Sequence, residues 1–210
     1  MRSVLRGWCF CESSVSNLVK AYDSVLDLAK FDESVPSWNL DAVIRGCAAK
    51  RAPPLAPPVF KEDLSTKTFT SPKADRETVG NLYEKEFDEK LGEATELVYI
   101  GLEWTDADVV KLCGAIATGK LVKLNELYLS DNQIGDAGVA ALAEAAGKLP
   151  QLKDLYLNDN QIGDAGVAAL AEVAGKLPQL EALYLEDNPN ISQQAKDALK
   201  AALPKCGVYF

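Results

Sequence analysis

Two consecutive segments of this chain are nearly identical, and this repetition constrains the fold more than any other feature. Leu124–Gln151 and Leu152–Gln179 are each 28 residues long and differ at only four positions. A third copy begins at Leu180 and carries one inserted residue before Ile191. A degenerate copy is expected upstream, 27 residues before the first full one, with leucine-type positions at Leu97, Ile100 and Leu102. Self-similarity at a fixed period is typical of solenoids, in which each unit stacks on its neighbours.

Each repeat combines the two periodicities of regular secondary structure. Leu127 and Leu129 alternate with polar or aromatic residues, which predicts a short strand with one buried face. Asn132 follows where the chain leaves the strand, and its amide can satisfy backbone groups at that bend. Asp136 precedes apolar residues at helical spacing, where a carboxylate can accept the free N–H groups of the first helical turn. A glycine and a proline then end the helix.

The motif LxxLxLxxNxIGDxGxxxLA, which covers residues 96–210 in full or degenerate form, resembles leucine-rich repeats of the ribonuclease-inhibitor-like type. The resemblance implies an α/β fold: a short solenoid whose parallel strands line a concave side and whose helices cover the convex side. It also implies that a helix over Ile191–Leu203 and a final strand cap the C-terminal end. An internal repeat leaves an apolar end that must be covered, which predicts a helical capping region on the N-terminal side as well.

The N-terminal 95 residues divide into three predicted parts. Residues 1–52 are expected to be helical, with an amphipathic helix over 12–30 and a shorter one over 38–51. Residues 53–70 are rich in proline and predict a stiff, polyproline-like connector. Residues 71–95 predict a capping helix that begins at Ser71-Pro72 and ends near Leu91. Its inward side chains are predicted to be Val79, Leu82, Tyr83 and Phe87.

The composition excludes several classes of function. The chain has no histidine, which removes Ser-His-Asp and Cys-His catalysis and histidine-ligated zinc. A net charge of −9 argues against nucleic acid and anionic membranes as partners, and no apolar run reaches the ~20 residues of a membrane span. Five cysteines without a CxxC pair are typical of reduced thiols rather than of a metal site. We therefore expect no cofactor, no metal, no membrane insertion and a cytoplasmic location.

The positions between the repeat leucines are expected to face the concave side, where the stacked units align them into rows. The row of tyrosines contains Tyr128, Tyr156 and Tyr184, preceded by Gly101, and the row of aspartates contains Asp131, Asp159 and Asp187, preceded by Trp104. Tyrosine is enriched at binding hot spots, and a nearby cation would relieve repulsion between the carboxylates. These rows predict a non-enzymatic protein-binding module for a basic segment, whose Arg or Lys side chains lie on the rings. Alternatively, recent duplication copied these surface residues without any binding role.

Two other functions remain open from the sequence. The helical half and the connector would suit a structural or accessory subunit of a large assembly, organellar and of the algal type. The segment Trp8-Cys9-Phe10-Cys11-Glu12 has a WCxxE pattern that resembles the start of a helix in Toll/interleukin-receptor-like domains. That resemblance implies a fragment of an NAD hydrolase with Glu12 as the catalytic carboxylate. Such a domain has three strands before this helix, however, and only seven residues precede Trp8. The abrupt start is what a fragment, or a shortened relative, of a longer protein would show, and we expect no catalytic residue.

Overall fold

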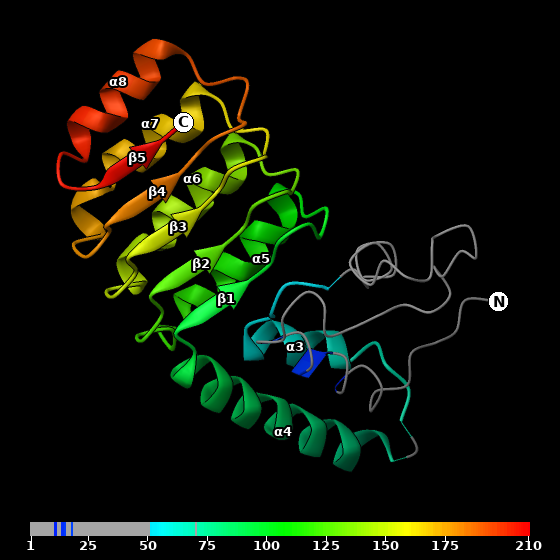
Figure 1. Ribbon diagram of the computed structural model, residues 1–210. Coiled ribbons are helices and arrows are strands. Elements are labelled where there is room, and N and C mark those ends of the chain that lie inside the picture. Colours follow the sequence, from blue (N-terminus) through cyan, green and yellow to red (C-terminus); the bar gives the residue numbers. More distant parts are fainter. Residues whose placement is uncertain (1–10, 12–13, 16–17, 19–50, 70) are drawn as a thin grey trace, which may run out of the picture.

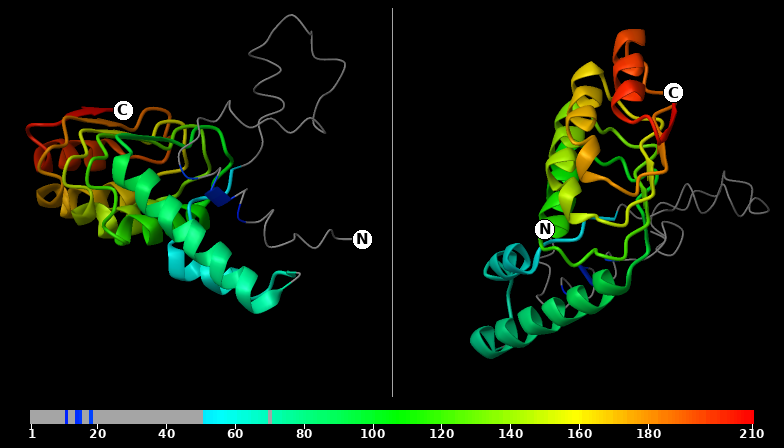
Figure 2. Two further views of the ribbon diagram at one scale, coloured as in Figure 1. Left: turned by 90° about the horizontal axis from the view of Figure 1, so that it is seen from below. Right: turned by 90° about the vertical axis from the view of Figure 1, so that its left-hand side faces the viewer.

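The computed structural model describes residues 11, 14, 15, 18, 51–69 and 71–210. In this part of the chain, five strands form one parallel sheet whose spatial order follows the sequence order. A helix follows each of the first four strands, and these helices lie side by side on one face of the sheet (Figure 1). Figure 2 shows the two layers, with a long helix crossing the N-terminal end of the stack. The predicted α/β solenoid of parallel strands and helices is confirmed.

The strands are short and the helices of the repeats span two to three turns. The strands are β1 (Glu96–Val98), β2 (Glu126–Tyr128), β3 (Asp154–Tyr156), β4 (Ala182–Tyr184) and β5 (Gly207–Tyr209). The helices of the repeats are α5 (Asp106–Ala117), α6 (Asp136–Ala145), α7 (Asp164–Glu172) and α8 (Gln193–Ala202). The 3₁₀ turns η3 (Ala146–Lys148) and η4 (Ala174–Lys176) extend α6 and α7. Before β1 lie α3 (Pro57–Leu64) and α4 (Pro72–Glu93).

The core lies between the sheet and the helices. Four side chains of the second repeat are fully buried: Leu127, Leu129, Ile134 and Val139. The equivalent side chains of the next repeat are at most 1% exposed. The strand leucines point toward the helices because alternate side chains of a strand leave opposite faces of the sheet. The other face of the sheet therefore carries the remaining strand residues, and we call it the concave face.

Each repeat asparagine connects two neighbouring units. Asn160 is 5% exposed, and its Nδ2 donates to the carbonyls of Leu129, Leu157 and Asn158 at 3.0–3.1 Å. Its Oδ1 accepts the N–H of Ile134 at 3.0 Å. Asn132 and Asn188 occupy the same position in their repeats. The predicted role of the amide at the bend is confirmed, and half of its partners belong to the preceding repeat.

The repeat aspartates act on the following repeat, not on their own helix as predicted. Asp136 is the first residue of α6, and its Oδ1 accepts the N–H groups of Gly163 and Gly166 at 2.7 and 2.9 Å. Asp106 and Asp164 likewise accept from the start of the next helix, at Gly135 and Ser192. A side chain at this position lies beside the neighbouring helix rather than over its own first turn. Each carboxylate therefore fixes the start of the next unit.

The second glycine of the IGDxG motif makes room for this carboxylate. A Cβ at Gly166 would lie 2.8 Å from Asp136 Oδ1 and 3.0 Å from Ile162 Cγ2. We expect Gly166→Ala to lower the free energy of unfolding in urea by about 1–3 kcal/mol, although alanine is the better helix former. Gly175→Ala is the matched control, because its Cβ would meet nothing within 4 Å. An unchanged or raised urea midpoint for Gly166→Ala would show that the carboxylate does not need this space.

The first repeat is placed three residues away from the predicted register. Val98, not Gly101, pairs with Tyr128, so the offset to the second repeat is 30 residues instead of 27. The carbonyl of Trp104 accepts the N–H of Gln133, as that of Ile134 accepts the N–H of Gln161. The Trp104 side chain is only 2% exposed. Tyr99 is fully buried and stacks on Trp104 with 4.5 Å between ring centroids. These two aromatic side chains fill the space that smaller leucine and isoleucine side chains fill in the other repeats.

The segment before β1 contains a helix that the sequence analysis missed. The predicted connector at 53–70 includes α3, which begins at Pro57 because proline fits the first turn of a helix. The helix predicted from Ser71 corresponds to α4. Its predicted inward residues are buried except Leu82, which is 42% exposed, and Leu91 is buried as well. Phe60 of α3 stacks on Tyr83 of α4 at 3.7 Å, which joins the two helices.

A buried arginine joins the N-terminal region to the first repeat. Arg51 is 2% exposed, its Nη2 donates to the carbonyl of Val98 at 3.0 Å, and its guanidinium lies 4.7 Å from the ring centroid of Tyr99. The Trp104 indole N–H donates to the Arg51 carbonyl at 2.7 Å, and the Tyr99 hydroxyl donates to that of Leu18 at 3.0 Å. The helices predicted over 12–30 and 38–51 otherwise lie outside the described residues. Among the helices that are described, none has both the length and the apolarity to cross a bilayer.

Candidate protein-binding face

Four tyrosines stack across the concave face, one from each of the last four strands. Tyr128, Tyr156, Tyr184 and Tyr209 have successive ring centroids 4.1, 4.4 and 4.9 Å apart, with planes within 11° of parallel. We call this row the tyrosine ladder. The sequence predicted that the first three lie side by side but not that Tyr209 joins them. Its position in the predicted final strand could have indicated this. Val98 continues the row at the N-terminal end.

Stacking decides which part of each ring a partner can reach. Both faces of Tyr156 and Tyr184 are covered by neighbouring rings, so a partner cation cannot lie on them as the sequence analysis expected. The ring edges remain accessible to a partner. The Tyr128 hydroxyl donates to the Glu126 carboxylate at 2.5 Å. Burial, followed by the hydrogen bonds to Glu126 and Tyr156, raises the pKa of Tyr128 well above its ordinary value.

Carboxylates at the starts of the strands form the first flank of the ladder. Glu96, Glu126 and Asp154 lie opposite one another in the strand register, and we call them the strand-start acids. Burial, followed by repulsion from Glu126 and Glu181, raises the pKa of Asp154 above its ordinary value. Lys153 forms an ion pair with Glu181 at 2.7 Å and opposes this shift only in part. The flank therefore holds carboxylates that repel one another.

The second flank consists of Asp131, Asp159 and Asp187, which we call the loop aspartates. All three are exposed and adopt left-handed backbone conformations, with φ between 54° and 56°. Aspartate tolerates this conformation better than most residues. Trp104, which was predicted to belong to this row, is buried in the core, so that placement was wrong. Gly101 occupies the corresponding position in the first repeat and has a φ of 66°.

The polar side chains between the ladder and the loop aspartates bond to one another. Ser130 Oγ donates to Asn158 Oδ1 at 2.6 Å, and Asn158 Nδ2 donates to Asp159 Oδ2 at 2.9 Å. Together with the bond from Tyr128 to Glu126, these contacts commit side-chain donors of the face to acceptors within it. What the face presents to a partner is mainly carboxylate oxygen and the edges of aromatic rings.

A family model described as Leucine Rich repeats (2 copies) matches residues 122–171. These residues are leucine-rich repeats. Among 56 matching chains of known structure is leiomodin-1 actin-binding site 2, with a TM-score of 0.52 and 16% identity. The match covers 60% of this chain and 76% of that one, and at this identity it shows the fold alone. Comparison with curated proteins finds no match.

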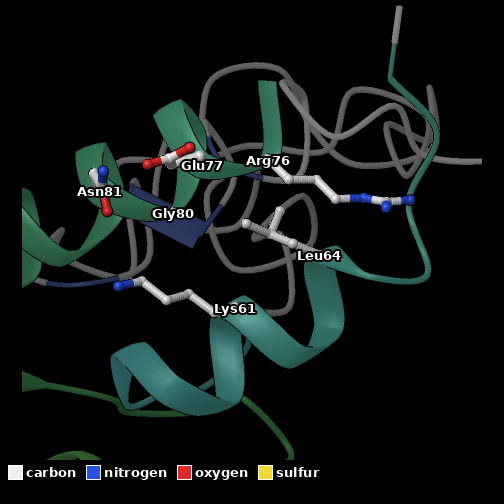
Figure 3. A pocket seen from close by; sticks show the side chains of 6 residues that line it. All are labelled: Lys61, Leu64, Arg76, Glu77, Gly80 and Asn81. Atoms are coloured by element: carbon white, nitrogen blue, oxygen red, sulfur yellow. The ribbon is translucent and has the colours of Figure 1, made fainter. Parts of the chain in front are cut away.

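Outside the leucine-rich repeats, one cleft lies between α3 and α4 (Figure 3). It has a volume of about 300 Å³ and is lined by Lys61, Leu64, Arg76, Glu77, Gly80 and Asn81. Figure 3 shows the Lys61 and Arg76 side chains pointing in opposite directions. Lys61 pairs with Glu84 at 2.6 Å, and Arg76 donates to the carbonyls of Ser65 and Lys67. Both cations are thus engaged within the protein and do not converge on a common point.

The described residues hold few groups suited to metal binding or catalysis. No cluster of three or more His, Cys, Asp or Glu side chains in the described ranges has the arrangement to hold a metal ion. Burial raises the pKa of the Cys113 and Cys206 thiols to about 11, so both are protonated at neutral pH. Trp8 and Glu12 of the WCxxE pattern lie outside the described residues, and Cys11 is buried.

Proposed function

We propose that this protein is a non-enzymatic interaction module that binds a basic segment of a protein partner through its concave face. The observation that carries the proposal is the tyrosine ladder with acidic rows on both flanks. Leucine-rich repeats supply an extended sheet face suited to protein binding, and the name of the leiomodin-1 match describes an actin-binding site. The proposed partner of the present chain is a positively charged protein segment.

Electrostatics favours a basic partner over a neutral one. Burial first, and then repulsion from Glu126 and Glu181, raises the pKa of Asp154, and a bound cation would reduce that repulsion. Exposed ion pairs contribute at most about 1 kcal/mol each and weaken with salt. The aromatic edges therefore supply the part of the affinity that persists at higher ionic strength. Tyrosine is well suited to this role because ordering it costs little side-chain entropy.

A second function is favoured by one feature of the N-terminal helices. Val59 of α3 and Leu82 of α4 are 45% and 42% exposed, so each of these helices presents one large apolar side chain to solvent. A role as a structural subunit of a larger assembly would place this surface against another component. Co-migration of the native protein with a large complex, lost on Val59→Ser and Leu82→Ser, would favour that function.

The concave face is tested by replacing its three central tyrosines. Tyr128→Ala, Tyr156→Ala and Tyr184→Ala together should reduce recovery of the partner in a pull-down more than tenfold, since hot-spot side chains each contribute about 2 kcal/mol or more. The control replaces exposed residues of the helical side, Glu144→Ala and Glu172→Ala, and should leave recovery unchanged. Circular dichroism verifies that both variants fold. Full recovery by a folded tyrosine variant would assign these residues to copied surface without a binding role.

A further inference from the structure

We infer that the basic segment recognised by the concave face is an α-helix, lying across the strands along the tyrosine ladder. This inference rests on the proposed function and adds the conformation and the direction of the bound segment. Three independent properties of the face support it: its hydrogen-bonding groups, the spacing of its rings and the position of its two acidic flanks.

The hydrogen-bonding groups of the face do not suit an extended peptide. The backbone groups of β2, β3 and β4 are engaged on both sides by neighbouring strands, so they cannot pair with a further chain. The side-chain donors of Tyr128, Ser130 and Asn158 are committed to acceptors within the face. The hydroxyl of Tyr156 is hydrogen-bonded to those of Tyr128 and Tyr184. An extended peptide would find carboxylates for its N–H groups and few donors for its carbonyls. A helix satisfies its own backbone and requires neither.

The ring spacing matches a helix better than an extended chain. Successive tyrosine centroids are 4.1–4.9 Å apart. Successive turns of an α-helix are about 5.4 Å apart, so each turn can place a side chain near one ring. Side chains on the same face of an extended chain are about 6.7 Å apart, so only three of them fit along the four rings. Over the four rungs of the ladder, only the helix keeps one contact for each repeat.

The two acidic flanks lie on opposite sides of the ladder, as the two basic borders of a bound helix require. Within one repeat the strand-start acid Glu126 and the loop aspartate Asp131 stand on either side of Tyr128. A helix with side chains is about 10–12 Å wide. Small residues on one face of the helix can contact the ring edges, while basic side chains on its two borders extend toward the two acidic flanks. The expected segment therefore has a strip of small residues with Lys or Arg at one-turn intervals along each border. An extended chain directs only one row of side chains toward the face.

The test uses three synthetic 18-residue peptides of matched Ala and Lys content with the intact protein. The first places lysines along both borders of an alanine strip, and the second has the same residues with lysines distributed around the whole helix. The third is the first peptide with two central alanines replaced by proline, which prevents a continuous helix. Fluorescence anisotropy should give a dissociation constant at least tenfold lower for the first peptide than for the other two. Circular dichroism should show that its helicity increases on binding.

A conservative protein variant locates the binding. Asp131→Asn, Asp159→Asn and Asp187→Asn remove the charge of one flank, and asparagine tolerates the same left-handed backbone. This variant should weaken binding of the first peptide several-fold, and Glu144→Gln with Glu172→Gln should not. Equal affinity for all three peptides, still reduced by the loop-aspartate variant, would overturn the helix and leave the proposed function intact. No binding of any peptide, or binding indifferent to the concave substitutions, would overturn both.

Discussion

Deletion of residues 1–92 should leave the remaining repeats aggregated, or folded with a melting temperature about 15 °C or more below that of the whole chain. In the intact chain Phe87 and Leu91 of α4 are fully buried in the same core as Leu97 of the first repeat. The deletion would also remove Arg51, which covers Tyr99 and bonds to Trp104. An uncovered end of a repeat stack exposes apolar surface to water, so it loses stability and promotes association.

Point variants test the same cap without removing it. Phe87→Ala should lower the free energy of unfolding by about 3–5 kcal/mol, since it leaves a cavity at a fully buried site. Leu82→Ala on the same helix is the control and should cost less than about 1 kcal/mol, because Leu82 is 42% exposed. Thermal denaturation and size-exclusion chromatography provide the measurements. If fragment 93–210 is monomeric and as stable as the whole chain, the N-terminal half is not a cap.

Asn160→Ala should destabilise the protein by about 3–5 kcal/mol, a loss comparable to that of a large core side chain. The substitution leaves the N–H of Ile134 without an acceptor. It also removes one of the two donors to each of three carbonyls, those of Leu129, Leu157 and Asn158. An unsatisfied buried N–H costs about 1–3 kcal/mol, and each of the three other hydrogen bonds contributes about 0.5–1.5 kcal/mol. Water entering the vacated space would recover part of this sum, which is why we expect the lower half of the full range.

The chemical specificity of the asparagine can be separated from its size. Asn160→Asp keeps the shape of the side chain but cannot donate to three carbonyls, and it buries a charge, so it should be at least as destabilising as alanine. Asn158→Ala, two residues earlier on the partly exposed concave face, should change stability by about 1 kcal/mol or less. Urea denaturation distinguishes these cases. A fully stable Asn160→Asp variant would mean that the amide donor contributes nothing to the stack.

The near-identical repeats were predictable because copying fixes every spacing at once. Leu127 and Leu155 pair in register, and so do Tyr128 and Tyr156, as expected from two copies of one unit. The first repeat was misplaced because the spacing of Leu97, Ile100 and Leu102 imitates the leucine pattern by chance. The pair Asp106-Ala107 stands 30 residues before Asp136-Ala137 and carried the correct register. Polar residues with fixed bonding partners were thus more reliable markers than leucines, which fit the core in several registers.

The binding face was predictable in its position and less so in its chemistry. Strands about 4.8 Å apart place equivalent side chains at nearly the distance of stacked rings, so the tyrosines had to stack rather than stand apart. The repeat spacing predicts only that the rings are adjacent, which is why open ring faces were expected. The hydrogen bonds that Asp136 accepts could not be predicted from one repeat, since the donors, Gly163 and Gly166, belong to the next repeat. Contacts between units depend on the stacking itself, which no single unit specifies.

The bonds between units also bear on how such a chain can change in length over evolutionary time. Each internal 28-residue unit offers an asparagine to the unit before it and an aspartate to the unit after it. A duplication of one unit in the gene would insert a segment whose two ends already match both neighbours, so no compensating substitution is required. One such event adds a tyrosine to the ladder and a carboxylate to each flank, and so enlarges the recognition surface by a fixed increment. The first unit, with Tyr99 and Trp104 fitted to Arg51, has no such freedom and anchors the array at one end.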